Sequence, residues 1–302
     1  MNTALFTSAR LNQAFAKVRR NSDCAGADGL TPAVYSLGLD ARLGALQRAI
    51  ENGTYQPQPL RAIALNLPGK KPRMLCVPTV DDRIAQTAVA QSLAPEFEAR
   101  FADFSYGYRP ARSVPLALDA LTEHAVTRPL LVDADIRDFV GSVGHPRLEH
   151  LIDAWVTDDT ARALSRRWIA QHQSRRGCGN ALGSPLSPWF ANLYLDQLDR
   201  TLACAGYTPV CYADDFVIAC RNEYEASAAL RLAADTLSAM GLELNADKTH
   251  VVYWDDGIDF LGVRLGGRAP CAKPRTTRCV ETELSPQSYC GEGSVSLRSK
   301  QA

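Results

Sequence analysis

The chain has 302 residues, 46% of them apolar, which is enough for a sizeable core in one large domain or two closely packed lobes. Its formal net charge of zero gives no support for nucleic-acid binding at the level of the whole chain, and basic residues gather only locally, at 61–73, 162–176 and 264–278. Nine cysteines without a C-x-x-C pair and five histidines complete no zinc pattern.

No targeting or membrane-spanning segment is expected. The chain up to Arg20 has basic residues among its apolar positions, which predicts an amphipathic helix rather than a signal peptide. No apolar run reaches about 18 residues, so no membrane span is expected. An odd number of cysteines without a secretory leader favours a reducing compartment, and we expect a cytoplasmic protein.

Helical and strand-like segments alternate along the chain. Helices are expected at 1–20, from Thr31-Pro32, and at 39–52, 79–94, 115–125, 145–155, 158–172, 189–202 and 223–240. Strands are expected at 61–67, 74–77, 130–136, 250–254 and 260–263, with a basic turn joining the first two into a hairpin. From Gly266 the composition loses periodicity, which predicts a poorly ordered tail or the start of a further module.

Asp214 and Asp215 lie between two short apolar runs, a pattern that predicts a strand, a tight turn and a strand. Taken alone, the pair is most simply a polar turn. However, Asp135 ends the apolar strand 130–136, and neighbouring strands would bring the three carboxylates to one sheet edge. That arrangement can hold two magnesium ions about 3.5–4 Å apart. The layout of antiparallel strands backed by helices is an α+β fold.

Two loops have open interpretations. The stretch 101–112 is rich in aromatic and arginine side chains, including Tyr106, Arg109 and Arg112, which suit a nucleic-acid template, or else pack as an aromatic loop on a core. The Gly/Ser/Pro stretch 177–188 lets backbone approach another group closely, or is an ordinary linker before a helix.

A series of short motifs, in order from about Asp28 to Val263, resembles the reverse transcriptases of the bacterial group II intron-like branch. The motifs are at 27–29, 71–73, 77–83, 105–110, 134–136, 183–188, 192–195, 212–215, 248–249 and 260–262. The resemblance implies an RNA-directed DNA polymerase that uses two Mg²⁺ ions, with Mn²⁺ as a substitute, and takes an RNA template, a nucleic-acid primer and dNTPs.

The same resemblance implies a right-hand polymerase fold. An N-terminal helix and fingers would cover 1–129, and a palm would cover 130–265 with part of the fingers inserted at about 145–180. The family continues into a helical thumb, but 266–302 has no amphipathic helical pattern. The thumb is therefore expected to be short or missing, with 266–302 as a tail, truncated thumb or fusion junction.

Roles for individual residues follow from the matched motifs. The catalytic group would be Asp135, Asp214, Asp215 and Lys248, with the carbonyl of Ile136 joining the three aspartates as a metal ligand. The nucleotide-binding residues would be Lys71, Arg73, Val140, Leu182 and Gly183, and the primer grip would be Phe260, Leu261 and Gly262.

Three positions depart from the family pattern. Val140 replaces a bulky aromatic residue beneath the sugar, which predicts weakened discrimination against ribonucleotides. Gly141 replaces a usual Asp that is not a principal metal ligand. Leu182 stands where the family commonly has Gln, a change seen in diversity-generating relatives with error-prone templating, so altered fidelity is a hypothesis.

The amino-acid sequences at 183–188 and 55–60 are most similar to those of transcriptases associated with type III CRISPR systems. Those enzymes are thought to help acquire spacers from RNA. The expected partner is a CRISPR integrase or another phage-defence protein. Two alternatives stay open: a diversity-generating or degenerate intron-type reverse transcriptase, and a non-catalytic RNA-binding protein on a degenerate polymerase palm.

Overall fold

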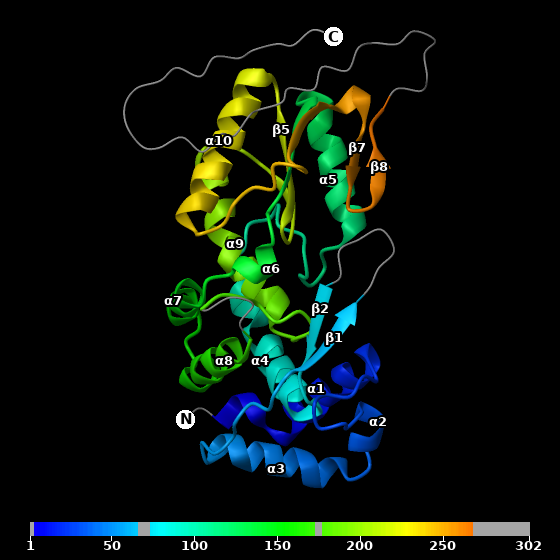
Figure 1. Ribbon diagram of the computed structural model, residues 1–302, viewed down its shortest axis with the longest axis vertical. Coiled ribbons are helices and arrows are strands. Elements are labelled where there is room, and N and C mark those ends of the chain that lie inside the picture. The colour runs from blue at the N-terminus through cyan, green and yellow to red at the C-terminus, as the bar shows by residue number, and fades with distance from the viewer. Residues whose placement is uncertain (1–2, 66–72, 173–176, 268–302) are drawn as a thin grey trace.

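The computed structural model describes residues 3–65, 73–172 and 177–267. Two parts follow one another along the long axis of the molecule (Figure 1). One end holds N-terminal helices and a β-hairpin: α1 (Ser8–Asn21), α2 (Pro32–Tyr35), α3 (Leu39–Glu51), β1 (Arg61–Leu65) and β2 (Arg73–Val77). The long helix α4 (Val80–Glu98) leads from this end towards the other, which is built around a four-stranded sheet.

The remaining elements follow in chain order. They are α5 (Val114–Thr127), β3 (Leu130–Asp135), α6 (Phe139–Ser142), α7 (His145–Trp155), α8 (Asp159–Gln171), α9 (Ser187–Cys204), β4 (Val210–Tyr212), β5 (Asp215–Cys220), α10 (Glu223–Ala239), β6 (His250–Tyr253), β7 (Ile258–Phe260) and β8 (Val263–Leu265). The mixture of helices with antiparallel sheets confirms the predicted α+β class.

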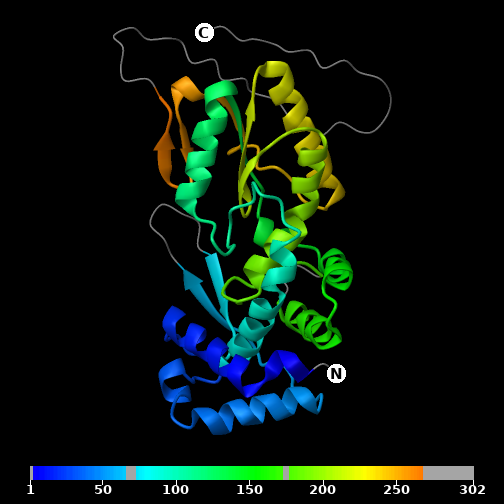
Figure 2. The same cartoon turned by 180° about the vertical axis from the view of Figure 1, so that it is seen from behind.

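The sheet has the order β4-β5-β3-β6, with every neighbouring pair antiparallel. Successive side chains of a strand point to opposite faces. Leu131, Val217 and Ala219 therefore belong to the core cluster shared with α5 and the β7–β8 hairpin. Val132 and Ile218 belong to the larger core that includes α9 and α10. Seen from both sides, α5 and α10 cover opposite faces of the sheet (Figures 1 and 2).

The N-terminal end is held together by buried polar contacts as well as by apolar packing. The Asp82 carboxylate, fully buried at the start of α4, accepts hydrogen bonds from the Tyr55 hydroxyl and, at 3.0 Å, from the Gln58 amide. Trp168 of α8 in turn donates to the Tyr55 hydroxyl at 3.1 Å. A buried carboxylate requires such donors. This network therefore ties the segment before β1 to both α4 and α8.

Most predicted elements are present with ends shifted by a few residues, and the Thr79 side chain caps α4 as expected. The prediction of one last strand at 260–263 is wrong. The structure has a hairpin there, because Leu261 and Gly262 both have positive φ (52° and 79°) and turn the chain between β7 and β8. The short helix α6 was not predicted, and 268–302 of the expected tail lies outside the described residues.

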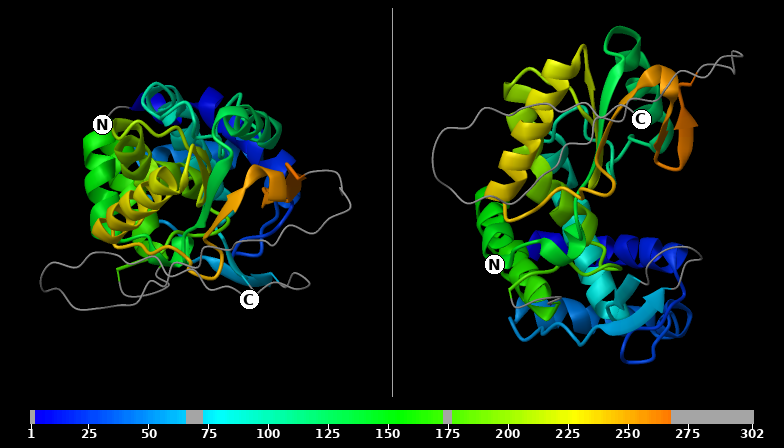
Figure 3. Two further views of the ribbon diagram at one scale, coloured as in Figure 1. Left: turned by 90° about the horizontal axis from the view of Figure 1, so that it is seen from above. Right: turned by 45° about the horizontal axis from the view of Figure 1, so that its top comes forward.

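The packing of α5 bears on the expected division of the chain. Ala117, Leu121 and Ala125 of α5 are buried against the sheet cluster, so α5 lies with the sheet although it precedes residue 129. The helices α7 and α8 stand to one side, between the sheet end and the N-terminal end (Figure 3). No helix within the described ranges is long and apolar enough to cross a membrane.

Asp199 of α9 is a carboxyl group in the core beneath the sheet. It is 5% exposed and accepts a hydrogen bond of 3.3 Å from the Cys211 thiol. The pKa of Asp199 is raised to about 7. Burial is the main cause and the nearby Asp196 adds to it, while the hydrogen bond from the thiol and the charge of Arg109 lower the pKa. The folded protein therefore holds a proton here over a pH range in which the unfolded chain releases it.

We predict that Asp199→Asn is increasingly stabilising as pH rises from about 4 to about 7. Since the folded pKa lies above the unfolded one, Asp199 destabilises the fold progressively through this window, by up to about 4 kcal/mol. Asparagine keeps the shape and cannot ionise. Urea unfolding at several pH values measures the difference between variant and parent. The exposed Asp235→Asn of α10 is the control. A difference independent of pH contradicts the prediction.

Candidate active site

Three aspartates meet where the central strands of the sheet end. Asp135 closes β3 and pairs directly with Asp215, the first residue of β5. Asp214 lies in the two-residue turn that joins β4 to β5, beside Ala213 with a positive φ of 56°. The structure thus brings Asp135, Asp214 and Asp215 to one end of the sheet, which we call the catalytic edge.

The catalytic edge carries an excess of negative charge. Burial, followed by the charges of Asp214 and Asp135, raises the pKa of Asp215 to about 6. Burial also raises the pKa of Asp214, while Arg73 and Lys248 partly oppose the effect of Asp135 there. Like charges held together in this way favour the binding of a cation.

A loop after α10 supplies two partners to Asp135. The Lys248 ammonium lies 2.7 Å from one carboxylate oxygen, and the Asn245 side-chain amide donates to the other at 2.9 Å. The Asn245 backbone N–H also donates to the Asp135 carbonyl at 2.8 Å. Asp135 raises the pKa of Lys248 through this hydrogen bond. Lys248 therefore stands at the catalytic edge as a cation.

The orientation of the Ile136 carbonyl follows from the backbone pairing. Ile136 forms an antiparallel bridge with Leu244, and the hydrogen bonds come from its flanking residues, Arg137 N–H to the Glu243 carbonyl and Asn245 N–H to the Asp135 carbonyl. In such a non-hydrogen-bonded pair the polar groups of the central residue point away from the partner strand. The carbonyl of Ile136 accordingly points to the side of β5, where Asp214 and Asp215 lie.

The ligand chemistry of the catalytic edge fits a divalent cation. The available donors are carboxylate oxygens and one backbone carbonyl, which suit Mg²⁺ or Mn²⁺. Across the described part of the chain, however, no three His, Cys, Asp or Glu side chains stand close enough to form a complete metal-binding group. At Asp135, one carboxylate oxygen accepts a hydrogen bond from Asn245 and the other from Lys248. An ion bound at Asp135 would share or replace these bonds.

Arg73 opens β2 on the hairpin that faces the catalytic edge, and its side chain is exposed. Its charge reaches the site, because it lowers the pKa of both Asp214 and Tyr108. The second predicted cation of this motif, Lys71, lies outside the described residues.

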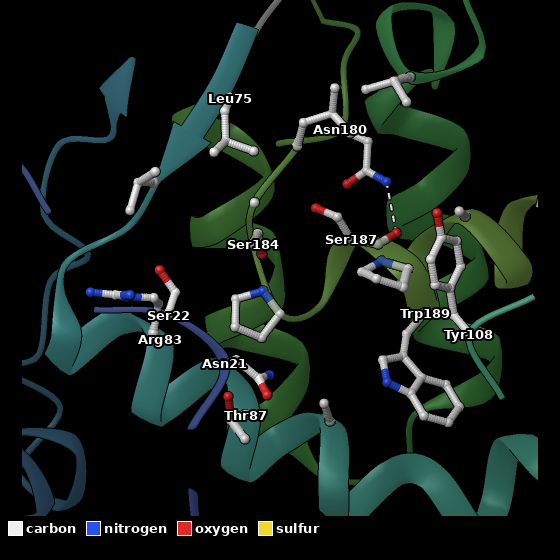
Figure 4. A pocket seen from close by; sticks show the side chains of 18 of the residues that line it. Asn21, Ser22, Leu75, Arg83, Thr87, Tyr108, Asn180, Ser184, Ser187 and Trp189 are labelled. Carbon is white, nitrogen blue, oxygen red and sulfur yellow. Dashed lines mark hydrogen bonds between the residues drawn. The ribbon is translucent and has the colours of Figure 1, made fainter. Parts of the chain in front are cut away.

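A cavity of about 570 Å³ lies between the hairpin β1–β2 and the catalytic edge. Val140, Leu182 and Gly183 line it, as do Tyr108 and Asp214. Figure 4 shows Leu75, Ser184 and Trp189 around it, with Asn180 donating to the Ser187 carbonyl at 2.8 Å. We refer to it as the active-site cavity. Its volume is typical of ligand sites.

The Gly/Ser/Pro loop at 177–188 packs closely against strand β2 of the same chain. The Cys76 N–H donates to the Leu182 carbonyl at 2.6 Å, and a Cβ on Gly183 would lie 2.9 Å from the Cys76 carbonyl oxygen. Gly183 also has a φ of 107°, which only glycine adopts readily. This loop is thus fixed against β2, and Gly183 is required by backbone packing. Gly141, the other small residue of the site, lies against the Asp138 carboxylate, so a Cβ there would require the Asp138 side chain to move.

The predicted template contact of Arg109 is wrong. Its side chain is 3% exposed, forms an ion pair of 3.0 Å with Glu98 and donates to the carbonyls of Ala102 and Ser105. Tyr106 is half-buried against the core of α5 and the sheet. Arg112 lies over the Tyr106 ring and bonds Asp103 at 2.9 Å. Arg109 therefore follows the alternative interpretation, packing on a core, while the template contacts of Tyr106 and Arg112 stay predictions.

The residues predicted as a primer grip lie at the β7–β8 hairpin. Phe260 is buried against α5 and the sheet, while Leu261 and Gly262 form the turn of the hairpin. Asp259 of the same hairpin helps to raise the pKa of Asp133 to about 6, after burial and Asp135. The hairpin therefore lies on the face of the sheet that carries the acidic residues.

Sequence reasoning missed three residues of the site. Asp133 precedes Asp135 by two positions, so both side chains leave β3 on the same face, and this spacing could have shown it. Asn245 lies three residues before Lys248, with no local signal for its bond to Asp135. Tyr108 lines the active-site cavity although its motif was assigned to the template.

Gly107 fixes the turn of the catalytic edge from outside. A Cβ at this position would lie 2.6 Å from the Ala213 backbone nitrogen, and Asn192 holds the Gly107 carbonyl at 2.8 Å. On either side, Tyr106 N–H donates to the Cys211 carbonyl at 2.8 Å and Cys211 N–H to the Phe104 carbonyl at 2.9 Å. The Ala213–Asp214 turn is therefore packed against a rigid loop.

We predict that Gly107→Ala displaces this turn and destabilises the fold by about 1–3 kcal/mol, because neither backbone can yield freely. Thermal unfolding measures the effect. The matched control is Gly44→Ala in α3, where a Cβ meets only the flexible end of Arg48 and helix propensity favours alanine. Equal behaviour of both variants would refute the packing argument.

The chain is similar in sequence to known proteins. The family described as Reverse transcriptase (RNA-dependent DNA polymerase) matches residues 66–265, which is more than half of the chain. Protein YkfC of Escherichia coli (strain K12) is 27% identical over 288 residues, covering 80% of this chain and 75% of YkfC. The group II intron-encoded protein LtrA of Lactococcus lactis subsp. cremoris is 31% identical over 160 residues, covering 51% of this chain and 27% of LtrA.

Among solved structures, a chain of the partial Cas6-RT-Cas1--Cas2 complex is similar, with a TM-score of 0.46 and 23% identity. The match covers 78% of this chain and 41% of that chain, so this chain spans less than half of that larger polypeptide. The family match over residues 66–265 assigns the class of protein. The chain belongs to the reverse transcriptase family, as the sequence motifs predicted.

Proposed function

We propose that this chain synthesises DNA on an RNA template by two-metal nucleotidyl transfer. The observation that carries the proposal is the catalytic edge, where Asp135 and Asp215 pair across β3 and β5 next to Asp214. Such an edge, beside a cavity with the volume of a ligand site, is what template-directed polymerisation requires. The substrates are an RNA template, a nucleic-acid primer and dNTPs.

In this proposal the three aspartates and the Ile136 carbonyl hold two Mg²⁺ ions, which Mn²⁺ can replace. When bound, the ions activate the primer hydroxyl and neutralise charge on the leaving pyrophosphate. Arg73, with Lys71, binds the triphosphate from the fingers side. Lys248 is placed to balance the charge of the pyrophosphate or to give it a proton. Residues 260–262 hold the primer, and Arg112 and Tyr106 border the template path.

We predict that Asp214→Asn abolishes primer extension with magnesium while leaving the fold intact. Asparagine keeps the shape of the turn and removes a charged ligand, so activity should fall by about a thousandfold or more, as for other groups that act on transition-state charge. Incorporation of labelled dNTP on an RNA template measures it. Asp235→Asn, on the exposed face of α10, is the control. If the parent chain makes no Asp214-dependent product on any template, the alternative of a non-catalytic RNA-binding protein is favoured instead.

Val140 carries a second proposal, relaxed selection of the sugar. Val140 follows Phe139 in α6, lines the active-site cavity and is only half-buried. The aromatic residue that usually fills this place in the family would take up room that valine leaves. The cavity therefore accommodates a ribose 2′-hydroxyl. Leu182, which lines the same cavity, is proposed to lower fidelity by replacing a polar side chain that would orient the base pair.

We expect Val140→Phe to restore preference for dNTP over rNTP. A clash between the new ring and the 2′-hydroxyl costs about 1–3 kcal/mol, which corresponds to about 5- to 150-fold in the ratio of kcat/KM values. Single-nucleotide insertion with matched dNTP and rNTP measures the ratio. Val140→Leu, which adds bulk without a ring, is the comparison. Strong dNTP preference in the parent chain, unchanged in Val140→Phe, would rule the idea out.

The biological role is proposed from the sequence motifs at 55–60 and 183–188, which are most similar to those of CRISPR-associated transcriptases. Spacer acquisition from RNA, with a CRISPR integrase as partner, is the proposed role, and another phage-defence system is the alternative. Co-purification with an integrase encoded beside this chain tests it; failure of the two proteins to associate removes the integrase from the proposal.

A further inference from the structure

Tyr108 has a backbone conformation that its side chain does not favour. Its φ is 58°, in the left-handed region that bulky residues rarely adopt. The residue is nevertheless 54% exposed, so burial of the side chain offsets the strain only in part. Strained residues that present a side chain to a cavity cluster at functional sites. The strained Tyr108 therefore has a candidate role in binding a ligand in the cavity that it lines.

The loop on both sides of Tyr108 is rigid. Gly107 packs on the Ala213 backbone, and the guanidinium of Arg109 is buried in its ion pair with Glu98. These two neighbours leave the chain no freedom to relax the φ of Tyr108. The exposed ring is thus an imposed feature of the loop.

The ring lies beside the catalytic edge. Its centroid is 5.9 Å from that of Tyr212, in a tilted arrangement, and it lines the active-site cavity together with Asp214 and Val140. Figure 4 shows the ring next to Ser187 and Trp189, on the cavity wall across from Leu75. Among the described residues its hydroxyl has no hydrogen-bond partner. The ring therefore has one face and its polar tip available to a ligand.

The charged residues around Tyr108 indicate what kind of ligand binds beside it. Burial raises the pKa of the Tyr108 hydroxyl, the carboxylates of Asp214 and Asp215 raise it further, and Arg73 opposes them. Both the catalytic edge and the cation of the fingers are therefore within electrostatic reach of this side chain. A nucleotide whose phosphates extend from the aspartates to Arg73 places its sugar and base along the wall that Tyr108 forms.

We propose that the Tyr108 ring contacts the base pair formed between the template and the incoming nucleotide. The ligand is planar and apolar on its faces, and the cavity offers apolar lining as well, from Leu182, Pro188 and Trp189. Aromatic side chains bind bases through such contacts without reading their sequence. This inference rests on the proposed polymerase function and adds a nucleotide-binding residue from outside the catalytic edge.

The test compares Tyr108→Ala and Tyr108→Phe in steady-state primer extension on the whole chain. Loss of the ring should raise KM for dNTP by about tenfold or more. Tyr108→Phe keeps the ring and should stay within about threefold of the parent. Affinity for the primer–template duplex alone, measured by fluorescence anisotropy, should not change. Tyr224→Ala, an 86% exposed tyrosine on α10, is the matched control and should leave all values unaltered.

Each other outcome overturns the inference. An unchanged KM for dNTP in Tyr108→Ala shows that the ring does not touch the nascent pair. A loss confined to duplex affinity assigns Tyr108 to the primer–template instead. A fall in Tm or kcat with KM unchanged shows a structural role only. Inactivity of the parent chain itself, by contrast, refutes the proposed polymerase function, so the two failures are distinguishable.

Discussion

The direct pairing of Asp135 with Asp215 across β3 and β5 is the constraint on which the site depends. Like charges opposite one another weaken a sheet. The sheet accepts this pair at its end, where Asp214 adds a third carboxylate and burial raises the pKa of Asp215 to about 6. Apart from Asp133, which pairs with Val217, the other paired residues of the two strands are apolar, and the β3–β5 ladder is long enough to fix the register.

Three segments from outside the sheet are fixed around this pair by backbone contacts. Gly107 packs on Ala213 and so sets the position of Asp214. Asn245 bonds both the backbone and the side chain of Asp135. On the fingers side, β2 is bonded to the loop of Leu182, so Arg73 has a defined distance from the catalytic edge. The geometry of the site is therefore set by main-chain contacts, which substitution of surface side chains leaves in place.

The parts of the site that local pattern determines could be predicted from the sequence. Asp135 ends an apolar strand and Asp214-Asp215 interrupts another, and both patterns depend on neighbouring residues alone. Arg109 could not be placed, because its burial depends on Glu98, eleven positions away on α4. The same holds for Tyr108, whose exposure results from the packing of Gly107 on Ala213 and of Arg109 on Glu98. The β7–β8 turn was missed because Leu261-Gly262 lacks the Asn-Gly or Asp-Gly signal of such turns.

The ion pair of Lys248 with Asp135 explains how one arrangement can serve the chain both with and without a bound cation. Unpaired, three carboxylates at one edge would repel each other, and Lys248 offsets part of that charge. Its side chain is 60% exposed, so the pair contributes little to stability and the ammonium regains water when released. In the proposed mechanism, Asp135 would therefore exchange Lys248 for a divalent ion at small cost. A buried lysine would have made the same exchange expensive, because its lost partner would leave an uncompensated charge.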